Sequence, residues 1–353
     1  MPAIRRKMWK HWNASAKSAH KMKKWIDAVL QSPKVTAVPI MTHPGIEYIG
    51  KSVRDAVTDG EVHFTAVKKL EEMYPSAACC TIMDLTVEAE AFGAPINLPE
   101  HEIPTVSGRL VSNYDEVAAL QVPDLTAGRV PQYLLANRLC AQFVKDRPVF
   151  GGCIGPFSLA GRLFDMSEIM TAIYIEPDTI NLLLDKCTQF ITAYCQAMKK
   201  AGSDGVVMAE PAAGLLSDND ALLFSTEYVK QVVAAVQDDS FTVILHNCGN
   251  TGHCTNSMVR SGARALHFGN KADMSQIIAD VPENVIVMGN IDPVTVFKQA
   301  SSEEVRQVTA KLLRKMAGHA NFVVSSGCDL PPQVPHENIA AFFEAVAEFN
   351  ANK

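Results

Sequence analysis

Eight short apolar runs are spaced along the chain, and each is followed by a segment with helical periodicity. The predicted strands are Thr36–Met41, Ala78–Met83, Val149–Ile154, Gly205–Ala209, Phe241–Leu245, Ala265–Phe268, Val285–Met288 and Asn321–Ser325. The clearest amphipathic helices are Pro177–Ala201, Thr226–Gln237 and Ser302–Ala317. Apolar strands that alternate with helices indicate a parallel sheet covered on both faces. Eight such units predict the α/β class and a single (β/α)₈ TIM barrel.

Two segments depart from this alternation. Glu88–Arg138 is rich in proline and polar residues, and we interpret it as an insertion with short elements over the barrel mouth. Residues 1–30 are predicted to form a basic helical extension, and residues 31–353 the barrel domain. The first 25 residues hold eight lysines or arginines, no acid, and Trp9, Trp12 and Trp25. We expect an amphipathic helix that caps the barrel; a transit peptide and a basic anchor for an acidic partner are the alternatives.

Composition narrows the class of protein. The 353 residues carry a formal net charge of −6, which argues against nucleic acid as a partner because phosphate binding needs a basic face. No apolar run approaches the roughly 18 to 20 residues of a membrane span. The nine cysteines are irregularly spaced, and no apolar signal peptide precedes them. We therefore expect a cytoplasmic protein with reduced thiols.

Polar residues gather where the predicted strands end. Catalytic residues of TIM barrels lie at the carboxyl ends of the strands, so side chains far apart in sequence meet at one rim. The residues at these ends are His43, Asp84, Glu210, His246, Asn247, Cys248, His267, Asn290, Asp292 and Cys328. This convergence predicts an enzyme.

A split set of metal ligands is the strongest chemical signal. His246 and Cys248 are two residues apart, so on an extended backbone their side chains point to the same face. With Cys328 they form a zinc ligand set, and three protein ligands leave a fourth position open, as in catalytic zinc sites. The alternatives are a packed histidine with a buried thiol, a redox pair, or a competing metal set at His253 and Cys254.

Two carboxylates are candidates for catalysis. Glu210 is either a fourth ligand or a base, or a structural carboxylate that pairs with a lysine or caps a helix. Asp84 either binds substrate or orients a ligand histidine, or it has a structural role in a turn. His43, Asn247 and Asn290 are candidate substrate-binding residues. Asp292, which precedes a proline, is expected to start a helix.

Several segments resemble the uroporphyrinogen decarboxylase superfamily, and within it the zinc-dependent methylcobamide:thiol methyltransferases of the coenzyme M type. The resemblance covers about residues 30–348. It is carried by Met83–Gly93, Gly155–Gly161, His246-x-Cys248-Gly249, Gly289–Pro293, and Ser326–Asp329 running into Pro335-x-Glu337-Asn338. The decarboxylases differ at two places: they have an arginine-rich segment where this chain has Thr42–Tyr48, and they lack the zinc ligands.

This resemblance implies a (β/α)₈ barrel in which His246, Cys248 and Cys328 bind zinc. It also implies that zinc activates a small thiol, which takes the methyl group of a methylcobamide carried by a separate corrinoid protein. Three alternatives stay open. They are a corrinoid-dependent demethylase of an ether, amine or thioether, a uroporphyrinogen decarboxylase-like enzyme, and a metal-binding barrel without turnover.

Overall fold

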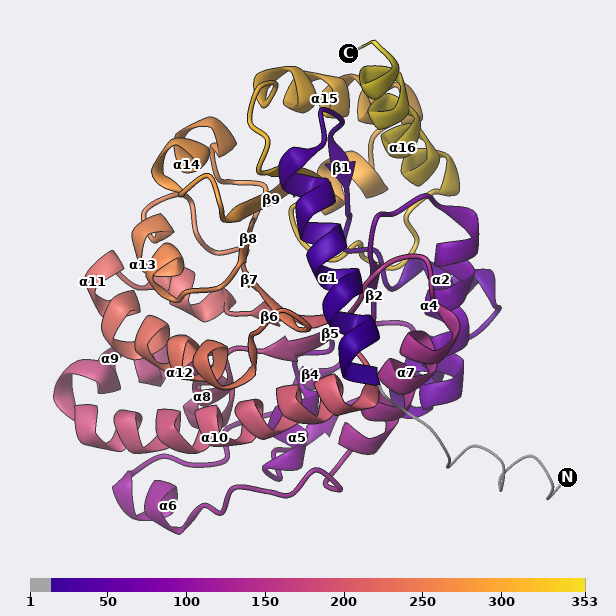
Figure 1. The fold of residues 1–353 in the computed structure, drawn as a ribbon. Helices are drawn as coiled ribbons and strands as arrows, with labels where there is room; N and C mark the ends of the chain where they lie inside the picture. Colours follow the sequence, from indigo (N-terminus) through magenta and orange to yellow (C-terminus); the bar gives the residue numbers. More distant parts are fainter. Residues whose placement is uncertain (1–13, 353) are drawn as a thin grey trace, which may run out of the picture.

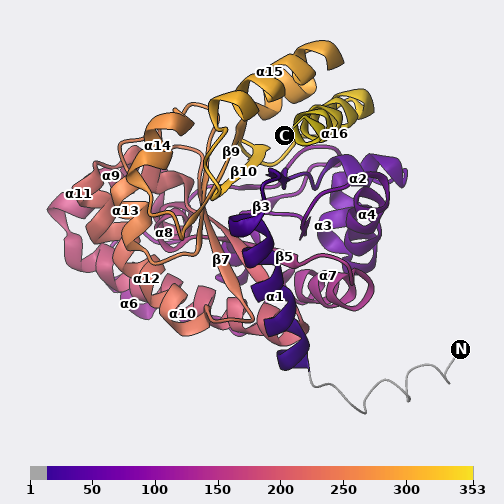
Figure 2. The same cartoon turned by 45° about the horizontal axis from the view of Figure 1, so that its top comes forward.

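The computed structural model describes residues 14–352. Predictions for Trp9 and Trp12 fall outside the described residues, and the predicted boundary between an extension and the barrel stays a prediction. Eight parallel strands form one sheet that curls around an axis (Figures 1 and 2). In sheet order they are β1 Thr36–Ala37, β10 Phe322–Ser326, β9 Ile286–Ile291, β8 Ala265–Phe268, β7 Thr242–Asn247, β6 Gly205–Ala209, β5 Val149–Ile154 and β2 Cys79–Cys80.

A backbone hydrogen bond brings the two end strands together. The Ala77 N–H, just before β2, donates to the Ala37 carbonyl of β1 at 3.0 Å. All eight predicted strands are present, and the predicted (β/α)₈ barrel is confirmed.

The strand bounds differ from the prediction in a way that matters for the site. β1 and β2 have two residues each instead of six. Beyond β1 the Ile40 N–H donates to Ser326 Oγ and the Thr42 N–H to Asp329 Oδ1, each at 3.0 Å. Side chains thus replace a neighbouring strand as hydrogen-bond partners there. β7 and β9 run further than predicted, so His246 and Asn290 lie within strands.

Inward-pointing side chains fill the barrel. They form one apolar cluster that includes Val38, Ile40, Ala78, Cys80, Phe150, Val207, Ile244, Ala265, Ile286 and Val323. Helix α1, Ala14–Gln31, closes the amino-terminal end, and its Met22, Trp25 and Val29 belong to the same cluster (Figures 1 and 2). The Trp25 indole N–H donates to the Ala77 carbonyl at 2.9 Å. Helix α1 thus closes the barrel at the amino-terminal ends of its strands, so we expect the functional site at their carboxyl ends.

Helices surround the sheet (Figure 1). They are α2 Pro44–Tyr48, α3 Val53–Thr58, α4 Gly60–Met73, α5 Val87–Ala91, α6 Tyr114–Ala119, α7 Val130–Phe143, α8 Pro156–Phe164, α9 Met166–Ile175, α10 Pro177–Ala201, α11 Asp218–Ala221, α12 Glu227–Val236, α13 Thr255–Arg260, α14 Met274–Asp280, α15 Ser302–Lys315 and α16 His336–Ala351, with the 3₁₀ segment η1 Pro211–Leu215 and the π segments η2 Leu222–Thr226 and η3 Pro293–Lys298. The predicted bounds of α10 are confirmed. Helix α15 begins with a capping box between Ser301 and Glu304. None of the described helices is both long and apolar enough to cross a membrane.

The predicted insertion contains short elements but ends earlier than expected. Strands β3 Ile96–Asn97 and β4 Thr105–Val106 pair as an antiparallel ribbon between α5 and α6. Helix α7 begins at Val130, inside the predicted insertion. The proline-rich composition had favoured an insertion, but Pro131 is well tolerated in the first turn of this helix, where its missing N–H has no partner to lose.

Candidate metal centre

The three predicted ligands meet at the carboxyl end of the barrel. His246 lies in β7, Cys248 follows one residue after the strand, and Cys328 follows β10 by two residues. One ligand atom of each lies within 4.8 Å of the others. Two sulfurs on one tetrahedral zinc would be about 3.8 Å apart, given Zn–S distances of about 2.3 Å. No other such group of histidine, cysteine or acidic side chains is found within residues 14–352.

The His246 ring is held on one side and free on the other. Its Nδ1 lies 2.8 Å from Nδ1 of His267, and His267 Nε2 lies 2.9 Å from Ser325 Oγ. His246 Nε2 is buried without a hydrogen-bond partner in the described chain. A buried, unpartnered ring nitrogen beside two thiols is what a metal ligand needs. The residues present therefore fit zinc.

The hydrogen-bond chain also selects a tautomer for each ring. If His246 Nε2 offers its lone pair to a metal, its Nδ1 carries the proton and donates to His267 Nδ1. His267 then carries its own proton on Nε2 and donates to Ser325 Oγ. Burial and the neighbouring His246 lower the pKa of His267 well below its usual value, which keeps this ring neutral.

The protonation of the two cysteines is coupled. The neighbouring Cys328 lowers the pKa of Cys248, while Cys248 and burial raise the pKa of Cys328. One sulfur of the pair is therefore close to the thiolate form in which cysteine binds metals.

The competing set at His253 and Cys254 is not assembled. His253 Nε2 lies 3.1 Å from the Leu216 carbonyl, and Cys254 Sγ lies 3.7 Å from the Ala213 carbonyl. Both side chains therefore contact backbone carbonyls in or directly after η1.

The Glu210 carboxylate caps a helix, which is one of the alternatives that the sequence left open. Its carboxylate accepts from the Phe157 and Ser158 N–H groups at 2.8 Å each, at the start of α8, and from Ser225 Oγ at 3.0 Å. The N-terminus of a helix favours a negative charge. Burial raises the pKa of Glu210, against these hydrogen bonds. The structure does not bring Glu210 into the group of three metal ligands.

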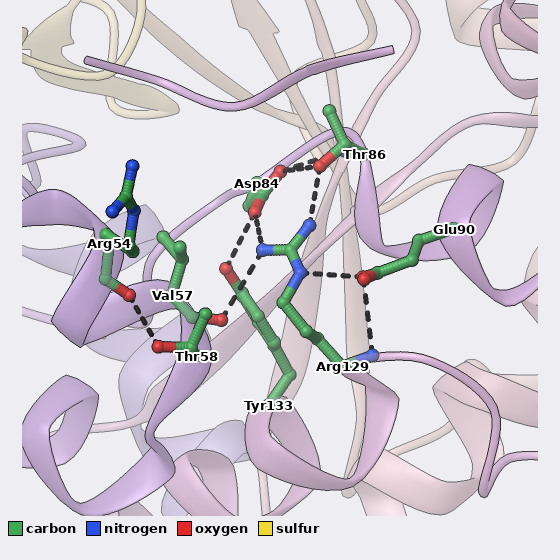
Figure 3. Close-up of polar contacts among 8 residues, drawn as sticks. All are labelled: Arg54, Val57, Thr58, Asp84, Thr86, Glu90, Arg129 and Tyr133. Carbon is green, nitrogen blue, oxygen red and sulfur yellow. Dashed lines mark hydrogen bonds and ion pairs between the residues drawn. The ribbon is translucent and has the colours of Figure 1, made fainter. Parts of the chain in front are cut away.

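Asp84 lies at the centre of a buried polar network (Figure 3). Its Oδ1 accepts from the Thr86 N–H at 2.9 Å and from Thr86 Oγ1 at 2.6 Å. Its Oδ2 accepts from Arg129 Nη1 and from the Tyr133 hydroxyl. Arg129 also donates from Nη2 to Thr86 Oγ1 at 2.7 Å and from Nε to Glu90 at 2.6 Å. Four hydrogen bonds fill the lone-pair sites of the Asp84 carboxylate in this structure, and its catalytic role stays a prediction.

The predicted substrate-binding residues have different surroundings. His43 Nδ1 lies 3.2 Å from Asp329 Oδ2, next to Cys328. Burial alone would lower the pKa of His43, but Asp329 raises it overall. Asn247 Oδ1 accepts from the Gly249 and Asn250 N–H groups, so this side chain shapes the loop after β7.

The two predictions at the end of β9 have separate outcomes. Asn290 Nδ2 donates to the carbonyls of Gly269 and Ala272 at 2.8 Å each. Asp292 Oδ1 accepts from the Val294 and Thr295 N–H groups, so Asp292 starts η3 as predicted.

Sequence reasoning missed two residues that support the site. His267 was recognised as a residue at a strand end but was given no role, yet its ring lies against that of a candidate ligand, His246. Its register opposite His246 in the neighbouring strand is the signal, and that register cannot be read from one sequence. Arg129, the residue directly before α7, forms ion pairs with Asp84 and Glu90. A lone arginine in the segment interpreted as an insertion gave no signal.

The fold and site define a TIM barrel whose carboxyl end carries a histidine–dithiol group that could hold a metal ion. The uroporphyrinogen decarboxylase (URO-D) family matches residues 28–349. The chain therefore belongs to the uroporphyrinogen decarboxylase family.

The chain is similar to proteins with two different activities. A methylcobamide:CoM methyltransferase of Methanosarcina acetivorans is 28% identical over 330 residues, 90% of this chain and 93% of that protein. A uroporphyrinogen decarboxylase of Coxiella burnetii is 27% identical over 288 residues, 78% of each chain. The solved structure of a methyltransferase from Methanosarcina mazei has a TM-score of 0.84 at 23% identity and covers 93% of this chain and 99% of its own. The predicted resemblance to the methyltransferase branch is confirmed, and the last comparison shows the fold.

Proposed function

We propose that this protein is a zinc-dependent methyltransferase that moves a methyl group between a corrinoid protein and a small thiol. One observation carries the proposal: His246, Cys248 and Cys328 converge, and His246 Nε2 is buried with no hydrogen-bond partner among residues 14–352. Sequence identity alone does not choose the reaction, because decarboxylases are almost as similar as the methyltransferase. The donor set favours the methyltransferase, since thiolate and imidazole ligands suit zinc.

The chain would hold zinc through His246, Cys248 and Cys328 and leave one position for the substrate. Bound there, zinc would supply Lewis acidity that keeps a thiol substrate deprotonated at neutral pH. The protein's own contribution is to fix the ligands in advance. His267 and Ser325 orient the imidazole from two neighbouring strands. Thr42 holds Asp329 through its N–H and hydroxyl, and so fixes the turn that carries Cys328.

In this proposal Glu210 and Asp84, which we expected to be catalytic, have structural roles. Glu210 fixes the start of α8 against β6, and Asp84 joins α5 and α7 through Arg129. Of the substrate-binding predictions, His43 is the best supported, because it contacts Asp329 beside a ligand cysteine. Asn247 and Asn290 are proposed to shape the loops around the mouth.

Metal analysis of freshly purified protein tests the proposal. We expect about one zinc per chain in the wild type and in Cys254→Ala, and loss of zinc in Cys248→Ala. Cys254 is a matched control because it belongs to the competing set. The zinc-loaded wild type is then mixed with methylcobalamin and a panel of thiols, and thioether formation is measured.

A folded wild type that neither contains nor binds zinc would sink the proposal, and porphyrinogen-like acids would be tested next. Zinc without thiol methylation, together with methyl transfer from an ether, amine or thioether to a corrinoid, would replace the thiol methyltransferase with the demethylase.

His267→Leu is expected to weaken zinc binding about 10- to 100-fold, the usual effect of removing a residue that orients a metal ligand. The physical reason is that His246 Nδ1 then loses its buried acceptor. Zinc affinity is measured by competition with a chromogenic chelator. The exposed His319→Leu serves as control and should retain wild-type affinity. Wild-type affinity in His267→Leu would show that the contact does not support the ligand.

A further inference from the structure

The four most exposed large apolar residues, among the side chains that the structure describes, come from two connections of the barrel. They are Ile175, Leu215, Tyr174 and Leu223, which are 73%, 67%, 66% and 62% exposed. Tyr174 and Ile175 end α9, Leu215 ends η1, and Leu223 lies in η2. We call these four residues the apolar patch. Large apolar side chains that gather on a surface are typical of an interaction site.

Contacts centred on Asp220 join the elements that carry the apolar patch. The Tyr174 hydroxyl donates to Asp220 Oδ2 at 2.8 Å, and Ser217 Oγ donates to the same oxygen at 2.6 Å. Leu223 follows Asp220 by three residues on a continuous helical stretch, so these two side chains lie on one face. Leu215 precedes Ser217 by two residues. Helices α9 and α11 lie side by side in both views (Figures 1 and 2). The patch therefore occupies one region of the surface.

The apolar patch adjoins the loop that carries a candidate metal ligand. Leu215 follows Gly214, and a Cβ atom on Gly214 would lie 2.4 Å from the Gly249 carbonyl carbon and 2.6 Å from the Asn250 nitrogen. Glycine is therefore required where η1 packs against the loop after β7. Gly249 directly follows Cys248. The patch thus begins next to the candidate metal centre.

The chain topology places the apolar patch at the end of the barrel from which a partner can reach the metal centre. Helices α8 and α9 connect β5 to the returning helix α10, and η1, α11 and η2 connect β6 to α12. Connections that follow parallel strands lie at the carboxyl end of a TIM barrel. Helix α1 closes the opposite end. A protein that covers the patch would therefore lie beside the barrel mouth.

The segments that carry the apolar patch are acidic. Residues 163–185 and 201–229 contain no lysine and no arginine. Glu168, Asp218 and Glu227 lie in these segments, and their side chains are partly or fully exposed. A surface with an apolar centre and an acidic rim complements a partner surface with an apolar centre and a rim of lysines or arginines. The charge thus indicates the kind of partner that fits.

We propose that the apolar patch is the docking surface for the corrinoid protein, whose contacting face has apolar side chains surrounded by lysines or arginines. The inference rests on the proposed function, which needs a second protein to present a methyl group at the metal centre. A partner seated on the patch contacts η1, which packs against the loop after Cys248. Docking there fixes the orientation of the methyl donor toward the thiol, which an in-line displacement requires.

Protein-bound and free methyl donors are compared to test the docking surface. The donors are a purified Methanosarcina corrinoid protein carrying methylcob(III)amide and free methylcobalamin, each with the thiol that the panel above shows to react fastest. The double variant Ile175→Ser, Leu223→Ser should raise KM for the corrinoid protein about tenfold and leave kcat/KM for free methylcobalamin within about twofold of the wild type. The control, Phe143→Ser, Val308→Ser, removes exposed apolar side chains from α7 and α15 and should match the wild type with both donors.

Salt tests the charge of the partner surface. Raising the ionic strength from about 0.05 M to about 0.5 M should raise KM of the wild type for the corrinoid protein and not for free methylcobalamin, because salt screens ion pairs at the rim of an interface. A KM for the corrinoid protein that does not change with salt would overturn the basic rim assigned to the partner.

Direct binding separates this inference from the proposed function. Cys328→Ala should bind the corrinoid protein as tightly as the wild type, and Ile175→Ser, Leu223→Ser about tenfold more weakly. This binding pattern in a protein that methylates no thiol would keep the docking surface and overturn the proposed function. Thiol methylation by a wild type that does not bind the corrinoid protein, or equal binding by the double variant, would overturn the docking surface. A wild-type dimer that the double variant dissociates would instead assign the apolar patch to a second copy of this chain.

Discussion

Cys328→Ala is expected to lower zinc affinity by at least a hundredfold and to abolish methyl transfer, while the barrel stays folded. Zinc bound by four protein ligands in a small domain is worth about 10–16 kcal/mol, so one ligand contributes about 3 kcal/mol. The fold should survive, because the apolar core of the barrel lies below the mouth and does not include Cys328. Zinc content, zinc affinity and the circular dichroism spectrum of the purified variant are the measurements.

Cys187→Ala is the control for the loss of a cysteine as such. Cys187 is fully buried in α10, so its removal should cost some stability and leave zinc binding intact. Retained turnover in Cys328→Ala would refute the zinc mechanism. Unfolding of Cys328→Ala on its own would instead assign the metal centre a structural role.

Arg129→Met is expected to destabilise the protein by about 3–5 kcal/mol, because it leaves the buried Asp84 carboxylate without its counter-ion. The Arg129 and Asp84 side chains are 7% and 1% exposed, so water cannot replace the lost partner. For a chain of this length the Tm should fall by roughly 4–7 °C. Thermal unfolding of the wild type and the variant measures the effect.

Arg54→Met gives the matched surface control. The Arg54 and Glu100 side chains form an ion pair while each is about half exposed, so breaking it should cost at most about 1 kcal/mol. Adding Asp84→Asn to Arg129→Met should recover part of the loss, since the neutral amide tolerates burial better. Equal Tm changes for Arg129→Met and Arg54→Met would show that the network in Figure 3 contributes little to stability.

The fold could be predicted because its signals are local. Apolar strands followed by helical segments repeat eight times, and each strand or helix can be recognised from the pattern of its own residues. The exact strand bounds could not be predicted, because they depend on contacts between distant residues. β1 is short because Ser326 and Asp329, almost 290 positions away, take the backbone donors that a neighbouring strand would otherwise take.

The candidate metal ligands could also be predicted from the sequence. His246 and Cys248 are two apart on a strand, and the period of two in an extended backbone puts them on one face. Cys328 follows another strand end, and parallel strands in a barrel bring such ends to the same rim.

The sequence by itself determined the barrel and the candidate set of metal ligands, because periodicity and spacing are properties of neighbouring residues. Only the tertiary structure decided how the remaining polar groups are used. It placed His267 against His246, turned Glu210 onto the start of α8, and filled both oxygens of Asp84. Each outcome depends on register, burial and contacts between distant segments, which have no local signature in the sequence.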